Sequence, residues 1–268
     1  MAEYTYHEQV DINNTRKLRA ILDTLPRFCH DFFRGIEATT SSRTRLAYAY
    51  DLRVFFEFLK ATNPALKDTA ITDIKIDILD QIKAIDIEEY LSYLTYYKSD
   101  IKERLNKENG KKRKLVSLRS FYNYYFKKEM IKTNPASLVS VPKLHEKAII
   151  RLDVDEVARL LDEVESAQNL SKKQQQFHEK TKVRDLAIMT LLLGTGIRVS
   201  ECVGLDINDV DFDNNGIKIR RKGGYEVIVY FGDEVREALL DYLEERKHMI
   251  ACDGHTNALF LSLQMKRI

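Results

Sequence analysis

Apolar residues recur at helical spacing through the first half of the chain. Three stretches, 43–60, 87–97 and about 112–128, carry apolar side chains three and four positions apart. This period is typical of amphipathic helices, so each stretch is predicted to be a helix with one buried face. Pro64 is expected to end the first helix, and Asp86 to cap the second.

Beyond residue 150 the pattern predicts further helices separated by a polar segment. Asp153 and Glu156 have the spacing of a capping box, which indicates a helix start. An apolar run over 183–193 predicts a second helix. Between the two, residues 167–181 are polar and rich in Gln and Lys, and we interpret them as a surface excursion.

Two alternating runs then indicate a β-hairpin. Residues 217–220 and 226–229 are joined by Lys222-Gly223-Gly224, which places a lysine at the tip of the turn. Asp233 is expected to cap the helix that follows. The predicted fold class is mainly α, with a helical bundle first and an α+β domain with a small β-hairpin or sheet second.

The length of 268 residues is sufficient for two domains. Asn134-Pro135 breaks the helical pattern, and residues 140–147 resemble an extended linker. The predicted organisation is an N-terminal arm at 1–24, a helical domain at 25–135, a linker at 136–150 and a second domain at 151–268.

Charge is concentrated in one part of the chain. The formal net charge is only +2, but residues 98–128 hold eleven Lys and Arg against three acids. Lys112 and Arg119 are seven positions apart and are expected on one outward helix face, opposite Leu115 and Leu118. Such a face can neutralise DNA phosphates, or it can simply be a solvated basic surface.

Residues 188–230 carry the chemistry. An apolar helix stops at Gly194-Thr195-Gly196, Arg198 follows at once, and Glu201 lies three residues later on the same face. We expect a buried-side arginine steadied by a carboxylate, with Lys222 on a mobile turn. This set suits a phosphodiester, because planar arginines that stay charged can hold its negative oxygens.

These residues resemble the tyrosine recombinase (phage integrase) family. The family motif is matched without a gap by Thr195-Gly196-Ile197-Arg198-Val199-Ser200-Glu201, and then in order by Leu205, residues 209–212 and residues 222–226. Residues 44–59 and 115–124, with the trailing Asn134-Pro135, resemble the family's core-binding domain less specifically.

The resemblance implies a DNA-binding domain at 25–135 and a catalytic domain from 151. It implies site-specific recombination of double-stranded DNA through a 3′-phosphotyrosine, by a tetramer of recombinase protomers on paired sites. Arg198 would be the first phosphate-clamping arginine, Lys222 the proton donor, and Glu201 the residue that orients Arg198. The expected DNA contacts are Lys111, Lys112, Arg113, Lys114, Arg119, Arg43, Arg45 and Arg221.

Neither a metal nor another cofactor is expected. Arginines can supply the charge, and the six histidines show no metal-ligand spacing. The three cysteines, Cys29, Cys202 and Cys252, are widely spaced and read as reduced thiols of a cytoplasmic protein. No run of eighteen apolar residues occurs, so no membrane association is expected.

The family's remaining catalytic parts are not found in these residues. Neither His248 nor His255 begins a His-x-x-Arg, and no tyrosine follows Tyr242, which is predicted to be core. We therefore expect a catalytic domain cut partway, from a clipped reading frame or a natural remnant, that binds DNA but cleaves nothing alone. Two alternatives remain: a non-catalytic DNA-binding regulator, or a helical interaction protein whose basic run is only surface.

Overall fold

The computed structural model describes residues 4–98, 103–143, 148, 150–167, 170–221 and 223–268. The chain folds as two compact units. The helical unit comprises Glu8–Lys147, and the mixed unit combines Met1–His7 with Ala148–Ile268. Among the described residues, no helix is long and apolar enough to cross a membrane.

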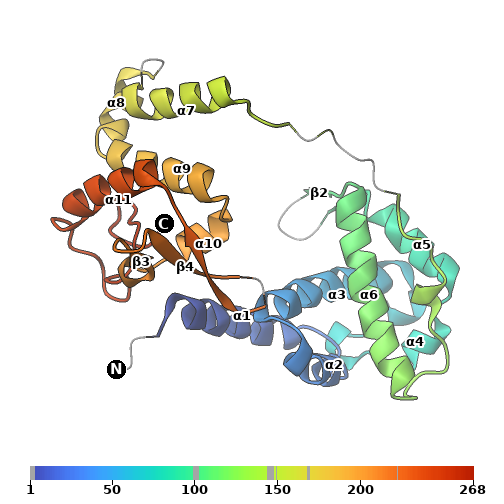
Figure 1. Ribbon diagram of the computed structural model, residues 1–268. Helices are drawn as coiled ribbons and strands as arrows, with labels where there is room; N and C mark the ends of the chain where they lie inside the picture. The colour runs from blue at the N-terminus through green and yellow to red at the C-terminus, as the bar shows by residue number, and fades with distance from the viewer. Residues whose placement is uncertain (1–3, 99–102, 144–147, 149, 168–169, 222) are drawn as a thin grey trace. The chain divides into compact units, whose positions relative to one another are not determined.

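The helical unit is built from α-helices with one short pair of strands (Figure 1). Its helices are α1 (Tyr6–Leu22, the first two residues of which group with the mixed unit), α2 (Cys29–Gly35), α3 (Ser42–Thr62), α4 (Ile78–Gln81), α5 (Ala84–Tyr93) and α6 (Glu108–Lys127). The strands β1 (Tyr96–Lys98) and β2 (Glu103–Leu105) pair antiparallel. Single 3-10 turns lie at Glu37–Thr39, Pro64–Leu66, Ile71–Asp73 and Pro135–Ser137.

Aromatic rings form the centre of this unit. Phe32 of α2, Phe56 of α3 and Phe121 of α6 are fully buried. Phe121 meets Phe32 edge to face with ring centroids 5.2 Å apart, and Phe56 at 6.2 Å. Edge-to-face pairs add about 0.5–1.5 kcal/mol each beyond burial of their area, so this cluster fixes α6 against α2 and α3.

Two predictions for this unit are wrong. α5 begins at Ala84, and the Asp86 carboxylate accepts the backbone N–H of Lys83 at 2.8 Å from inside the first turn, so Asp86 is not the cap. The helix also stops at Tyr93 instead of 97. Strand alternation over 96–98 then buries Tyr97 alone, a period of two that the helical pattern concealed.

Most of residues 1–24, the predicted N-terminal arm, form the helix α1. Its last turns bury Leu18, Ile21 and Leu22 in the core of the helical unit. The boundaries and roles of the predicted domains stay predictions.

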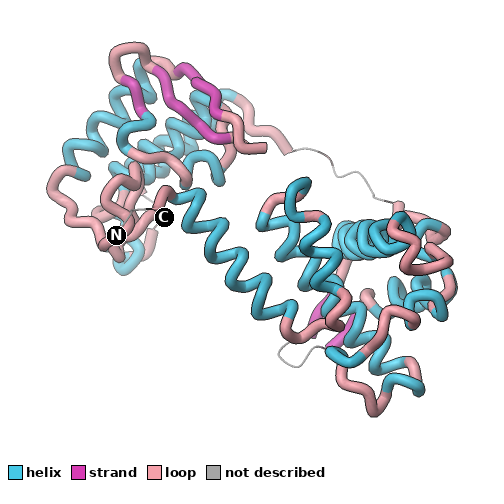
Figure 2. Tube along the Cα trace, turned by 90° about the horizontal axis from the view of Figure 1, so that it is seen from below, coloured by secondary structure: helices cyan, strands magenta, loops and turns pink. Residues whose placement is uncertain are grey.

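The mixed unit places helices around a three-stranded antiparallel sheet (Figure 2). Its helices are α7 (Val154–Ser166), α8 (Lys172–His178), α9 (Lys182–Thr195), α10 (Val199–Val203) and α11 (Asp233–Arg246), with a 3-10 turn at Ile207–Asp209. The sheet has the order β3 (Val210–Asp211), β4 (Gly216–Arg220) and β5 (Glu226–Tyr230).

Strand alternation directs one sheet face into the core. Ile217 and Ile219 of β4 are fully buried and pair with Val229 and Val227 of β5. They belong to one apolar cluster with Leu239 of α11 and its neighbours. The predicted fold class, mainly α with a small β-sheet in the second half, is confirmed.

The helix starts of this unit were predicted with mixed success. The capping box is confirmed, since Asp153 and Glu156 each accept the other's backbone N–H at 2.9 Å. Asp233 is wrong as a cap, because Gly232 holds that position and Asp233 is the first helical residue, where a negative charge suits the helix dipole. The surface excursion over 167–181 includes α8, which Ser171 caps.

Candidate functional site

The turn between α9 and α10 positions Arg198. Gly196 ends α9 in the left-handed conformation with φ +64°, and its N–H bonds the carbonyl of Leu192 at 2.9 Å. A glycine adopts this conformation without strain, so the chain can reverse sharply here. Arg198 then takes an extended backbone as the residue before α10.

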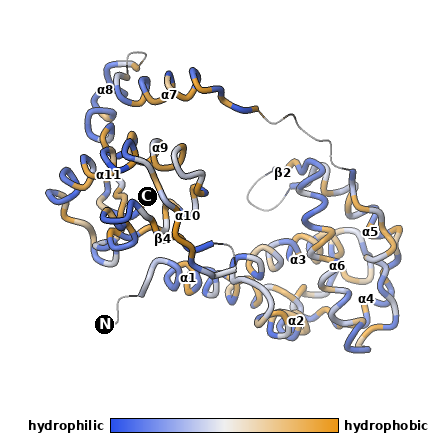
Figure 3. The backbone as a smooth tube through the Cα atoms, viewed as in Figure 1, coloured by the Kyte–Doolittle hydropathy of each residue, from blue (hydrophilic) through white to orange (hydrophobic). Residues whose placement is uncertain are grey.

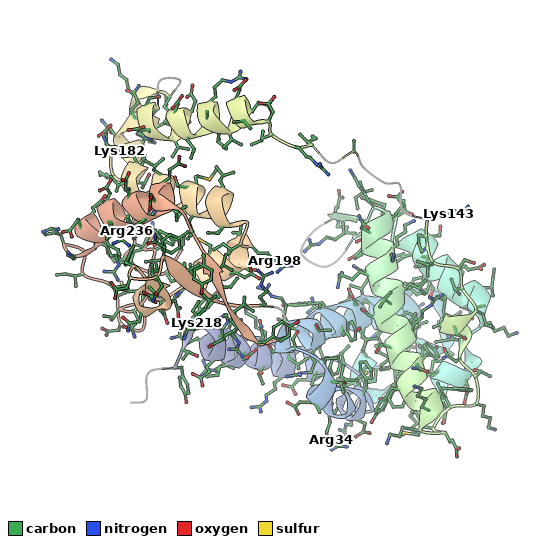
Figure 4. The ribbon with its side chains drawn as sticks, in the orientation of Figure 1. Arg34, Lys143, Lys182, Arg198, Lys218 and Arg236 are labelled. Carbon is green, nitrogen blue, oxygen red and sulfur yellow. The ribbon has the colours of Figure 1, made fainter. Side chains whose placement is uncertain are left out.

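Glu201 holds Arg198 at two points. One carboxylate oxygen accepts the backbone N–H of Arg198 at 2.8 Å, and the other accepts its guanidinium Nη1, also at 2.8 Å. The Glu201 side chain is 5% exposed, whereas that of Arg198 is 63% exposed and projects outward from the mixed unit (Figure 4). The prediction that Arg198 lies on the buried side is therefore wrong. At the start of α10 the Glu201 carboxylate is buried and the Arg198 guanidinium is exposed.

The charge state of Glu201 follows from its neighbours. Burial raises the pKa of this carboxyl. Hydrogen bonds from Arg198 and the positive charges of Arg198 and Arg221 have a larger, opposite effect, so the pKa is lower than its usual value. Glu201 is thus an anion at neutral pH. Arg221 acts on the same carboxylate as Arg198, so two of the predicted phosphate contacts share one neighbourhood.

The hairpin turn follows β4. The Arg221 N–H donates to the Tyr225 carbonyl at 2.9 Å, and the Gly224 N–H returns to the Arg221 carbonyl at 3.0 Å. Gly223 and Gly224 have φ +103° and +91°, which other residues rarely adopt. Lys222 lies outside the described residues, so its convergence with Arg198 stays a prediction.

The basic run on α6 divides into buried and outward cations, although its first turns are uniformly hydrophilic (Figure 3). Lys114 is only 6% exposed and lies 3.6 Å from a carboxylate oxygen of Asp51. Arg113 donates to the other Asp51 oxygen at 2.6 Å, yet its side chain is 49% exposed. The expectation of an outward basic face is therefore wrong at Lys114.

Two other predicted DNA contacts hold backbone carbonyls. Arg119 donates from Nε to the carbonyl of Ala136 at 3.0 Å and from Nη2 to that of Val139. Arg119 is half-buried, as Lys112 is, and the segment after α6 supplies both acceptors of its guanidinium. Arg45 has a side chain that is 12% exposed and likewise donates to two nearby carbonyls.

The remaining predicted contacts of the helical unit are more open. Arg43 is exposed at the start of α3, and Lys112 is half-buried on α6. Lys111 is half-buried and donates to the hydroxyl of Thr95 at 2.6 Å. Arg43 and Arg113 are therefore the exposed members of the predicted set in this unit, and Lys111 and Lys112 are half-buried.

One tyrosine hydroxyl and two cysteine thiols are buried, and burial disfavours their reactive, deprotonated forms. Tyr242 is fully buried, as predicted, and its hydroxyl accepts the Leu261 N–H at 3.0 Å; burial raises its pKa. Burial also raises the pKa of the Cys202 thiol to about 11 and that of Cys29 well above its usual value. Within the described residues, no group of His, Cys, Asp or Glu is arranged to hold a metal ion.

Asp51 is a buried partner of the basic run that sequence reasoning missed. It lies on the apolar stripe of α3, four residues before Phe55 and one turn after Ala47. An acid on such a stripe is a signal of a buried, paired carboxylate, because an unpaired buried charge is costly.

Comparison with known proteins places the chain in a family. The Phage integrase family model matches residues 150–268. The chain is 34% identical to tyrosine recombinase XerC of Caldanaerobacter subterraneus, over 89% of this chain and 63% of that protein. It is 31% identical to XerC of Chlorobaculum tepidum, over 90% of this chain and 71% of that protein. The chain spans about three fifths of the length of the first curated relatives it matches.

Two solved structures share the fold. A Tn1549 transposon integrase in complex with circular intermediate DNA gives a TM-score of 0.57 at 22% identity, over 90% of this chain and 72% of that one. The XerH site-specific recombinase bound to a palindromic difH substrate gives 0.59 at 19% identity, over 85% and 59%. The sequence similarity to XerC and the match to the family model show that the chain belongs to the tyrosine recombinase (phage integrase) family.

Proposed function

We propose that this chain acts in site-specific DNA recombination, in which the mixed unit holds the scissile phosphate of duplex DNA. The observation that carries the proposal is the exposed Arg198 guanidinium, fixed at two points by the buried and ionised Glu201. A fixed guanidinium with donors directed outward can bind a phosphate without first losing side-chain freedom.

The proposed chemistry requires charge stabilisation at phosphorus. A tyrosine phenolate oxygen forms a bond to the phosphorus, and the bond to the 5′ oxygen breaks, leaving a 3′-phosphotyrosine and a 5′ hydroxyl. Negative charge on the non-bridging oxygens peaks in the transition state, where Arg198 would donate. Lys222 would protonate the departing 5′ oxygen as the general acid.

The nucleophile is not assigned to any tyrosine of this chain. Tyr242 is core, Tyr225 lies in the hairpin turn, and Tyr230 ends the second hairpin strand, β5. The 268 residues contain no His-x-x-Arg. We therefore propose that this polypeptide by itself binds double-stranded DNA, through Arg198 and the outward cations of the helical unit, and does not cleave it. Pairing of protomers into a tetramer on two sites belongs to the same proposal.

A nicked suicide duplex tests this division of labour. The 268-residue chain should shift the duplex without forming a covalent adduct. A fusion that adds the His-x-x-Arg and tyrosine segments of an active family member should form the adduct, and Arg198→Ala should lower its rate by about 10²–10³-fold. Lys247→Ala, which removes an exposed cation directly after α11 that is paired with Glu244, is the matched control and should leave the rate unchanged.

The outcomes separate the candidate functions. An adduct with the 268 residues alone would contradict the proposed division, and an Arg198-independent fusion would contradict the role of Arg198. A non-catalytic regulator is the second candidate, favoured by the missing His-x-x-Arg within these residues. It predicts that the chain inhibits an active recombinase by competing for the same duplex.

A further inference from the structure

A carboxylate is buried where α3 meets α6. Asp51 is 2% exposed, and one of its oxygens, Oδ2, accepts Arg113 Nη1 at 2.6 Å and Ser117 Oγ at 2.7 Å. Both donors come from α6, one turn apart. The carboxylate therefore engages the face of α6 that carries Arg113 and Ser117.

This carboxylate is held at an energetic cost. Burial raises the pKa of Asp51 and lowers the pKa of Lys114, whose Nζ lies 3.6 Å from the other oxygen. Both directions mean that desolvation outweighs the attraction between the two charges. Apolar residues of similar volume often serve a helix interface at least as well, so stability alone does not explain this group.

The orientation of Arg113 gives a reason for the buried Asp51 carboxylate. One guanidinium nitrogen reaches the buried oxygen, while the side chain as a whole is 49% exposed. A guanidinium is a rigid plane with five N–H donors, so holding one nitrogen restricts the directions of the others. Glu201 restrains Arg198 in the same way in the mixed unit.

We propose that Asp51 is a positioning residue that directs Arg113 toward a phosphate of bound duplex DNA. The inference rests on the proposed function, since it assumes that the helical unit binds DNA. Lys114 supplies neutralising charge beneath the surface and does not contact phosphate. A restrained guanidinium loses less side-chain entropy on binding than a free one, which is the gain that the buried carboxylate provides.

A double-mutant cycle on DNA affinity tests the proposal. Arg113→Ala should weaken duplex binding about tenfold and reduce the salt slope by about one. Asp51→Asn keeps the shape but removes the charge, and should weaken binding several-fold. In the Arg113→Ala background, Asp51→Asn should cause no further loss, because the residue it positions is gone.

Stability is measured on the same variants, so that folding and binding are separated. A purely structural role for Asp51 would lower the melting temperature but leave the affinity of the folded protein unchanged, or would add its full loss to that of Arg113→Ala; either result overturns the proposal. Lys112→Ala, a neighbouring cation without the Asp51 bond, is the matched control. Its own loss should add to that of Asp51→Asn.

A second variant serves if Asp51→Asn does not fold. Arg113→Lys keeps the charge but replaces the planar fork by a single ammonium, and should lose most of the affinity that Arg113→Ala loses. Wild-type affinity in Arg113→Lys would overturn the inference. If the wild-type chain fails to bind duplex DNA, the proposed function fails; if it binds and Arg113→Ala is silent, only this inference fails.

Discussion

The two units each contain an exposed arginine held by a buried carboxylate. Arg198 and Glu201 are three residues apart in one turn, joined at 2.8 Å. Arg113 and Asp51 are 62 residues apart on two helices, joined at 2.6 Å. The same arrangement thus arises once from local backbone geometry and once from tertiary packing.

The two carboxylates differ in electrostatic environment. Glu201 receives a backbone N–H and the charges of two arginines, which together lower its pKa despite burial. Asp51 lies deeper, and desolvation raises its pKa despite Arg113 and Lys114. From these directions we expect the charged form of Glu201 to stabilise the fold and the charged form of Asp51 to cost stability.

The largest expected effect is in the helical unit. Asp51→Ala leaves the buried Lys114 ammonium without its counter-ion, which typically costs about 3–5 kcal/mol of unfolding free energy. Guanidinium melts followed by a probe within residues 8–147 measure this loss. A loss below about 1 kcal/mol would show that Lys114 reaches solvent, contrary to its 6% exposure.

A smaller loss is expected in the mixed unit. Glu201→Ala removes the side-chain acceptor of the Arg198 N–H at the start of α10, and loss of such a cap costs about 0.5–2 kcal/mol. The Arg198 side chain is exposed, so it can be solvated when its partner is removed. A cost for Glu201→Ala equal to that of Asp51→Ala would break the distinction between the two pairs.

Acid pH should affect the pairs in opposite directions. The folded pKa of Glu201 is depressed, so its stabilisation is present above the unfolded value of about 4.3 and is lost as pH falls through the folded pKa. The folded pKa of Asp51 is raised, so its contribution becomes less favourable as pH rises from about 3.9 through the folded pKa.

Urea melts across this acid range test the signs. The advantage of wild type over Glu201→Gln should grow with rising pH, and its advantage over Asp51→Asn should shrink. Parallel slopes for the two variants would contradict the assigned pKa directions.

The smallest effect is expected from Lys114→Met. This change replaces a buried cation by an apolar chain of similar length, while Asp51 keeps its bonds to Arg113 and Ser117. We expect stability within about 1 kcal/mol of wild type, and duplex affinity within a factor of about two, measured by fluorescence anisotropy. A tenfold loss of affinity would restore Lys114 as a DNA contact.

Sequence reasoning succeeded where the interaction is local. The Asp153–Glu156 capping box and the Arg198–Glu201 pair each span three residues, and the alternation of β4 and β5 is visible in the chain itself. Even there, the exposure of Arg198 was not predictable, because it depends on where α10 begins.

It failed where distant segments meet. Arg119 donates to the carbonyls of Ala136 and Val139, and Asp51 accepts a hydrogen bond from Arg113, which is 62 residues away in sequence. Helical periodicity identifies which side of α6 is apolar. It does not identify which polar groups of other segments pack against the edge of that apolar side. Five adjacent or nearby cations therefore looked alike in sequence and differ in structure.

The central claim is that both restrained arginines bind DNA phosphates. The most direct test is the salt dependence of duplex affinity for wild type and for the double variant Arg113→Ala, Arg198→Ala. The slope of log K against log salt should fall in magnitude by about two, since each lost phosphate contact removes about 0.9. An unchanged slope would contradict the claim.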